Sequence, residues 1–163
     1  VLVQAAPKVY EEGPGLESLR TVVQTFAEKY NSDFQANKMN LVLFDDALKH
    51  LITVSRILGM PCGNMLFVGV GGSGKQSLTR LASYIAGNFT FQITLTKAYN
   101  LNSFMDDLRM LYKMCGQQGT AATFLMTEAE MKDETFLEIM NSFLMTGEIP
   151  NLFPKVRSET ATA

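Results

Sequence analysis

The chain is organised around residues 65–77, which read MLFVGVGGSGKQS. The first four residues of this stretch are large and apolar, and such a run predicts a buried strand. After the glycine cluster, an apolar stripe from Leu78 to Ile85 keeps helical spacing and predicts a helix. The stretch therefore predicts a strand, a glycine-rich loop and a helix, an arrangement that can hold a phosphate group.

The residue types in this loop suit an anion. Glycine enters backbone conformations that a Cβ forbids, so successive N–H groups can point at one phosphate. The helix that begins near Gly74 adds the positive end of its dipole, and Lys75 would reach the β- and γ-phosphates as a mobile point charge. The residues expected to line the nucleotide site are Gly69, Gly71, Gly72, Ser73, Gly74, Lys75, Gln76 and Ser77. The alternative is a glycine-rich turn that only joins a core strand to a core helix.

The loop departs from the usual phosphate-loop pattern at one position. Gly69, Gly74 and Lys75 reproduce the GxxxxGK spacing, but Gln76 follows where Ser or Thr is expected. The hydroxyl of that Ser or Thr normally holds Mg²⁺. Ser77 comes one residue late and would point about 100° away on a helix. We therefore expect the phosphate-binding part of the site to be retained and the metal-binding part to be altered.

Composition and charge exclude several classes of protein. With 163 residues, of which 47% are hydrophobic and 18% charged, the chain has the length and composition of one globular domain. A net charge of -2 gives no electrostatic reason to expect a nucleic-acid partner. No apolar stretch is long enough to span a bilayer and no export signal is visible, so we expect no membrane partner and a reducing, cytosol-connected compartment. Cys62, Cys115 and His50 show neither a disulfide framework nor a zinc-binding spacing.

Apolar spacing along the chain predicts alternating helices and strands. Helical patterns cover 16–30, 45–58, 78–85, 101–115 and 136–144, and short apolar runs predict further strands at 89–95 and 121–126. Glycines predict helix ends at Gly59, Gly87, Gly116 and Gly147. The alternation implies right-handed crossovers and a parallel sheet, so the expected fold class is α/β with any ligand beyond the carboxyl ends of the strands.

A second candidate site follows the last predicted strand. Residues 123–128 read TFLMTE, where a P-loop ATPase carries an apolar run closed by Asp-Glu, the Walker B motif. The Asp normally steadies Mg²⁺ and the Glu activates the attacking water. Here Thr127 takes the first place and Glu128 the second. The alternative is that Glu128 is a solvated acid at a strand end. The same interpretation would make Glu130 a solvated acid as well.

Two separate positions therefore depart from the usual P-loop ATPase pattern in the same way, because each lacks the expected metal ligand. Gln76 and Thr127 stand where the two protein ligands of Mg²⁺ would be, and neither is charged. Mg²⁺ can keep waters where protein ligands are missing, so a nucleotide could still arrive with its ion. The sequence predicts nucleotide binding with slow or absent turnover.

Three separated blocks carry a resemblance to a known family. They are residues 39–47 (MNLVLFDDA), 69–78 (GVGGSGKQSL) and 146–154 (TGEIPNLFP). In this order they look like the fourth AAA+ module of an axonemal dynein heavy chain, over roughly residues 39–155. A phosphate loop with Gln after Lys is itself similar to the axonemal version of that module. The resemblance implies a P-loop NTPase (AAA+) large subdomain, in which helices flank a parallel β-sheet.

The resemblance also implies roles for individual residues. ATP or ADP, with Mg²⁺, would be the cofactors. Thr127 and Gln76 would stand at the metal, and Glu128 would be the general base. The phosphates would be contacted by Gly72, Gly74, Lys75 and Gln76, and the adenine would lie near Leu41 and Val42.

The family implies a place in a larger machine. Its motor is a six-module ring that converts ATP hydrolysis into force on microtubules, with the fourth module regarded as regulatory. The implied partners are neighbouring AAA+ modules of the same chain, dynein light and intermediate chains, and microtubules through other parts of the motor. The implied location is the cytoplasm, the cytoskeleton and the axoneme of the cilium.

The resemblance sets the expected domain boundaries. Residues 1–38 would be a lead-in with an amphipathic helix, residues 39–155 a partial AAA+ domain and residues 156–163 a flexible tail. An AAA+ module places a further strand between the phosphate-loop strand and the Walker B strand, and the sequence does not supply it. We therefore expect a fragment of a larger polypeptide with an incomplete sheet and unpaired strand edges.

Two other functions remain open. One is a scaffold module that holds ring geometry around an empty or permanently occupied pocket. The other is an unrelated P-loop kinase or GTPase, which only the phosphate loop supports because no guanine-reading Asn-Lys-x-Asp motif is present.

Overall fold

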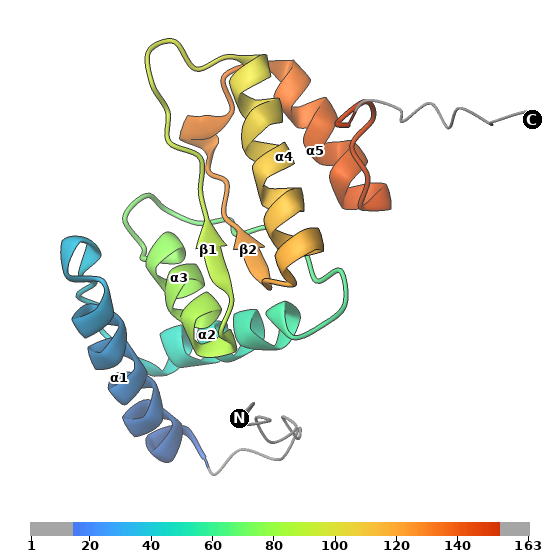
Figure 1. The fold of residues 1–163 in the computed structure, drawn as a ribbon. Helices are drawn as coiled ribbons and strands as arrows, with labels where there is room; N and C mark the ends of the chain where they lie inside the picture. Colours follow the sequence, from blue (N-terminus) through green and yellow to red (C-terminus); the bar gives the residue numbers. More distant parts are fainter. Residues whose placement is uncertain (1–14, 154–163) are drawn as a thin grey trace, which may run out of the picture.

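Two groups of helices lie on either side of a short parallel sheet (Figure 1). The computed structural model describes residues 15–153. The predicted lead-in at 1–14 and the predicted tail at 156–163 lie outside the described residues. None of the helices in the described range is both long and apolar enough to cross a bilayer.

The first group contains the phosphate-loop helix. It comprises α1 (Leu16–Asp33), the short 3₁₀ helix η1 (Gln35–Asn37), α2 (Asp45–Leu58) and α3 (Lys75–Ala86). The apolar residues of these helices recur at spacings of three and four, which puts them on one face of each helix. Together they bury the side chains of Val23, Tyr30, Met39, Leu48, Leu51, Val54, Leu78, Leu81 and Ala82.

The second group follows in sequence. It comprises β1 (Phe89–Phe91), α4 (Leu101–Gln118), β2 (Ala122–Phe124), the 3₁₀ helix η2 (Glu128–Glu130) and α5 (Glu134–Thr146). At its centre the rings of Phe104 and Phe136 stack, with centroids 4.5 Å apart. The buried side chains of this second core are Phe91, Ile93, Phe104, Leu108, Leu111, Phe136, Ile149 and Leu152.

The two strands pair in parallel, with Thr90 opposite Thr123. The ladder continues one step further, because the Leu125 N–H donates to the Phe91 carbonyl at 2.8 Å. Polar contacts also join the sheet to the first group, since the Thr90 hydroxyl donates to Ser83 of α3 at 2.8 Å. The predicted parallel α/β arrangement is confirmed for these two strands, although both are shorter than the apolar runs that predicted them.

The predicted strand at 65–68 forms no ladder, so that prediction is wrong for this structure. Met65 and Phe67 pack against the first core, whereas Leu66 and Val68 are each 85% exposed. This alternation of faces is the period of two that an extended chain produces. Among residues 15–153 the segment pairs with no strand, because the sheet holds only β1 and β2.

Glycines end most of the helices where the sequence predicted. Gly87 and Gly147 follow α3 and α5 with φ values of 79° and 72°, the left-handed conformation that favours glycine. The prediction of a helix end at Gly116 is wrong, because α4 runs on to Gln118 and Gly119 caps it at φ 65°. A glycine inside a helix costs only about 1 kcal/mol relative to alanine, which α4 tolerates.

Two glycine substitutions test this backbone. A Cβ at Gly63 would overlap the carbonyl oxygen of Ile57 at the end of α2. Gly63→Ala should therefore lower the free energy of unfolding by about 1–3 kcal/mol. Gly116→Ala is the matched control, since its Cβ would meet nothing within 4 Å, and it should raise the stability by roughly 0.5–1 kcal/mol through helix propensity.

Urea unfolding followed by circular dichroism of a polypeptide that carries the complete module measures both effects. Equal stabilities for the two variants would contradict the described backbone.

Candidate nucleotide-binding site

The loop between residue 69 and α3 has the backbone that its glycines predicted. Gly72 and Gly74 adopt φ values of 75° and 78°, where a residue with a Cβ would be strained. A Cβ at Gly71 or Gly72 would meet nothing within 4 Å, so this side of the loop is open. Leu41 lies against the other side, with Cδ2 3.5 Å from the position of a Cβ on Gly74.

Most of the loop's N–H groups are available to an anion. Among the amides of residues 71–75, that of Ser73 donates to the Val70 carbonyl at 3.3 Å. The other four, those of Gly71, Gly72, Gly74 and Lys75, donate to no residue in the described part of the chain. They lie at the N-terminal end of α3, where the helix dipole adds positive potential.

The Lys75 side chain folds back over the same loop. Its ammonium group donates to the carbonyls of Gly69 and Val70 at 2.8 and 2.7 Å, and to the Ser73 hydroxyl at 3.2 Å. These acceptors are neutral, and a phosphate oxygen offers a stronger, charge-assisted bond. The ammonium group is therefore held on the same loop as the four free amides.

The carboxyl ends of the two strands lie beside the start of α3. They contribute to a cleft of about 620 Å³ that also includes the first turn of α3. The cleft brings together Gln76 and Thr127, the two positions predicted to stand at the metal. Its other lining residues are Asn37, Arg80, Thr90, Gln92, Ile93, Thr94, Leu95, Ala129 and Glu130.

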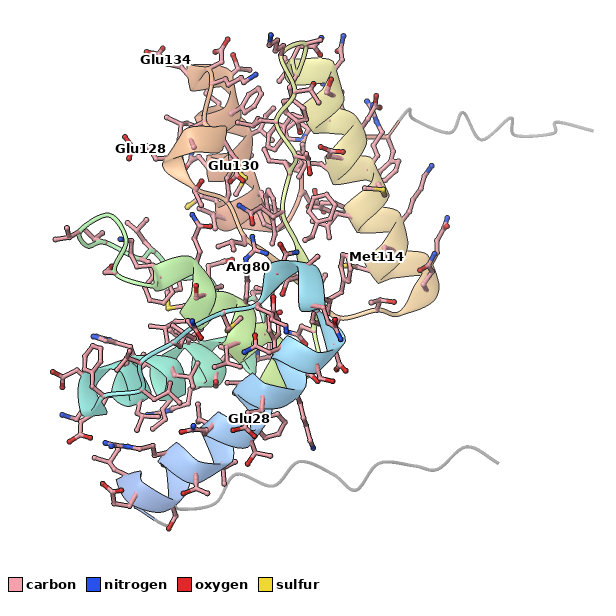
Figure 2. All side chains as sticks on the ribbon, turned by 90° about the vertical axis from the view of Figure 1, so that its left-hand side faces the viewer. Glu28, Arg80, Met114, Glu128, Glu130 and Glu134 are labelled. Atoms are coloured by element: carbon pink, nitrogen blue, oxygen red, sulfur yellow. The ribbon has the colours of Figure 1, made fainter. Side chains whose placement is uncertain are left out.

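Of the predicted site residues, only Gln76 and Thr127 line this cleft, and the phosphate-loop residues 69–75 are not part of its lining. Four further predicted residues also lie outside it. Glu128 is exposed at the start of η2, and Figure 2 shows it projecting outward above the phosphate loop. Leu41 is half-buried beside Gly74, and Val42 is 79% exposed. Ser77 is half-buried in the first turn of α3.

Glu130 is the site residue that the sequence interpretation missed. The alternative interpretation of these acids as solvated does not hold for Glu130, because Glu130 is only 5% exposed. One carboxylate oxygen accepts from the Gln92 amide at 2.7 Å and the other from the Thr127 N–H at 2.5 Å. The signal was present in the sequence as a capping box, a Thr followed three residues later by a Glu.

Arg80 completes this network. Its guanidinium donates to the Gln92 side-chain oxygen, so Gln92 connects α3 to Glu130 and η2. Figure 2 shows Glu128 further out than Arg80 and Glu130, of which Glu130 is buried and Arg80 half-buried. The network therefore fixes the end of the Walker B segment against the phosphate-loop helix.

The chain beyond η2 is anchored by a second cap. Asp133 accepts from the Thr135 N–H at 2.9 Å and from its hydroxyl at 3.0 Å, and so begins α5. These bonds lower the pKa of Asp133, because they favour its charged form. The segment from Thr127 to α5 thus has a cap at each end.

The donor set of the site fits a polyphosphate better than a bare metal ion. Gln76 and Thr127 supply only neutral oxygens, and both carboxylate oxygens of Glu130 already accept hydrogen bonds. No group of three or more His, Cys, Asp or Glu side chains within 15–153 is arranged to hold a metal. Mg²⁺ at this site would depend on phosphate oxygens and water for most of its octahedral shell.

A comparison with protein families identifies the fold. Residues 39–161 match the model of the P-loop containing dynein motor region D4. The chain belongs to this family. The match covers the phosphate loop, the strand ends and Glu130, so all of these residues lie within the D4 region.

Relatives of this D4 region are axonemal dyneins. Dynein axonemal heavy chain 5 of Mus musculus is 51% identical over 149 residues, which cover 91% of this chain and 3% of that protein. Dynein axonemal heavy chain 8 of Homo sapiens is 49% identical over 96% of this chain and 4% of its own length. Dynein axonemal heavy chain 2 of Homo sapiens is 45% identical over 90% of this chain and 3% of its own length.

These matches confirm the resemblance drawn from the three sequence blocks, and with it a partial AAA+ α/β fold. The chain spans only 3–4% of the length of these relatives.

Removing the Glu130 carboxylate tests the polar network. Glu130→Ala leaves the Gln92 amide and the Thr127 N–H without their acceptor, so it should lower the free energy of unfolding by about 1–3 kcal/mol. The exposed neighbour Glu128 provides the control, and Glu128→Ala should change stability by no more than about 0.5 kcal/mol. Denaturant unfolding of the complete module compares the two, and a larger loss in the Glu128 variant would contradict the described network.

Proposed function

We propose that this D4 region binds ATP or ADP at the loop of residues 69–75 and hydrolyses ATP slowly or not at all. The observation that carries the proposal is the set of four loop amides that donate to no described residue. In a loop at a helix N-terminus, such amides form a concave site for an anion. The family match supports nucleotide binding, which is general for dynein motor regions.

The nucleotide's phosphates are assigned to the loop and the start of α3. Gly72 and Gly74 bring the backbone close to the phosphates, and Lys75 exchanges its neutral acceptors for phosphate oxygens. Leu41, in contact range of Gly74, supplies an apolar surface for the adenine, and the exposed Val42 extends it. A Mg²⁺ ion bound with the nucleotide would meet Gln76 and Thr127 and would supply charge stabilisation to the phosphates.

The proposal of slow hydrolysis rests on the residues expected to activate water and hold the metal. The Glu128 carboxylate, the proposed general base, is exposed and accepts no hydrogen bond from a residue in the described range. A base of this kind works best when a neighbouring group orients it toward the attacking water. The neutral pair Gln76 and Thr127 adds no charged ligand to hold the metal in position.

The proposal extends to the whole motor through the relatives. A protein that carries this region would be a ciliary dynein heavy chain in the axoneme and the cytoskeleton, with neighbouring AAA+ modules of the same chain as its direct partners. Movement along microtubules and contacts with light and intermediate chains would belong to its other parts. Within such a motor, a site that binds nucleotide and turns it over slowly would have a regulatory role.

One observation favours a second function. Because Lys75 already binds three acceptors of its own loop, the loop is stabilised without a ligand. A scaffold module that holds ring geometry without nucleotide exchange would use the same contacts. The two functions differ in whether the affinity for ATP depends on Lys75.

Titration of a fluorescent ATP analogue into a polypeptide that carries the complete module tests the choice. Lys75→Ala should weaken binding about ten- to a hundredfold, the range expected for losing one charge-assisted hydrogen bond. The matched control is Lys113→Ala on the exposed side of α4, which should leave the affinity unchanged. Binding that ignores the Lys75 substitution would favour the scaffold.

Turnover of radiolabelled ATP by the same polypeptide checks the second half of the proposal. The expected rate is well below about one per second, the lower end of typical enzymes. A rate near one per second would contradict slow hydrolysis.

A further inference from the structure

Arg80 is a cation beside the nucleotide site to which neither the sequence nor the family match gives a role. It lies four residues after Gln76 in α3, so the two side chains share one face of the helix. Both line the cleft of about 620 Å³ that also contains Thr127. Arg80 is therefore on the side of the loop where the metal ligands of a P-loop ATPase would stand.

The charge of Arg80 is not neutralised by a carboxylate. Its guanidinium donates to the neutral side-chain oxygen of Gln92, and none of the ion pairs in residues 15–153 includes it. Glu130 is the acid of this network, but its two oxygens accept from Gln92 and from the Thr127 backbone. The cleft thus contains a positive charge held in place by an amide, with N–H groups left to donate.

The rest of the metal side is neutral. Gln76 and Thr127 add no negative charge that would attract a divalent cation. A nucleoside triphosphate nonetheless needs positive charge near its terminal phosphate. A guanidinium can supply it, because its planar fork binds phosphate oxygens bidentately.

We propose that Arg80 binds the terminal phosphate of the nucleotide from the metal side and so makes nucleotide binding at this site largely independent of Mg²⁺. This inference rests on the proposed nucleotide site. Gln92 and Glu130 act as positioning residues, since they hold the guanidinium at the edge of the cleft. The Gln92 acceptor is neutral, and a phosphate oxygen can therefore compete for the same donors.

The test measures the affinity for a fluorescent ATP analogue twice, with Mg²⁺ and with EDTA, in a polypeptide that carries the complete module. In the wild type, the two dissociation constants should agree within about threefold, because Arg80 replaces much of the ion's charge. Arg80→Gln should weaken binding about tenfold in EDTA, and by less than about threefold with Mg²⁺, where the ion compensates.

Two further variants control this test. Arg80→Lys keeps the charge but loses the planar fork, so it should weaken binding in EDTA by about threefold, less than Arg80→Gln does. Arg56→Gln removes an exposed arginine of α2 and should leave both constants unchanged. Circular dichroism confirms that each variant is folded, and if Arg80→Gln is not, a tenfold loss in EDTA for Arg80→Lys would overturn the inference.

The outcomes separate this inference from the proposed function. If Lys75→Ala abolishes binding while Arg80→Gln changes neither constant, or changes both equally, the role of Arg80 is wrong and the nucleotide site stands. If the wild type binds only with Mg²⁺, the role of Arg80 is also wrong. If no analogue binds in either condition, the proposed nucleotide site itself fails.

Discussion

The pairing of β1 with β2 is the constraint on which the site depends. The register sets Phe91 opposite Phe124, and the Leu125 N–H continues the ladder to the Phe91 carbonyl. The segments that follow β1 and β2 therefore leave the sheet side by side. Gln92 follows one strand and Thr127 the other, which puts the Gln92 amide within 2.7 Å of Glu130.

So short a sheet is marginal by itself, and packing holds it. The Thr90 hydroxyl donates to Ser83 of α3, and Phe91 belongs to the core beneath α4 and α5. These contacts connect the strand register to both groups of helices. They also keep the strand ends beside the N-terminal end of α3, where the loop amides lie.

The electrostatic balance of the site differs from that of a P-loop ATPase with both of its metal ligands. The proposed anion-binding half retains the loop glycines and Lys75, whereas the positions proposed to face the metal are Gln76 and Thr127, with the cation Arg80 beside them. A buried acid is present in Glu130, but it is used to hold backbone and side-chain donors. The arrangement favours binding of phosphate over positioning of a metal and an attacking water.

Sequence patterns predicted the features that depend on local chemistry. The glycines at 72 and 74 needed positive φ angles, and α2 begins at the two acids Asp45 and Asp46 that suit a helix N-terminus. Patterns failed where a distant partner decides the outcome. The period of two in 65–68 fixes which side chains face the core, but it does not supply the strand with which the segment would pair.

Glu130 shows the same limit at the scale of one residue. The sequence contains the capping box that binds Glu130 to Thr127, but the buried environment comes from Gln92, which is 38 residues away. Gly116 is a third case, because α4 continues through a residue whose type alone predicted a stop.

The most direct test of the central claim is the amide spectrum of the loop. In ¹⁵N-labelled protein that carries the complete module, ATP titration should shift the resonances of Gly71, Gly72, Gly74 and Lys75 in a saturable way, since phosphate oxygens become their acceptors. The Gly119 amide, which donates to Met114 at the end of α4, should not move. Unchanged loop resonances at saturating ATP, or shifts confined to other parts of the chain, would contradict the account.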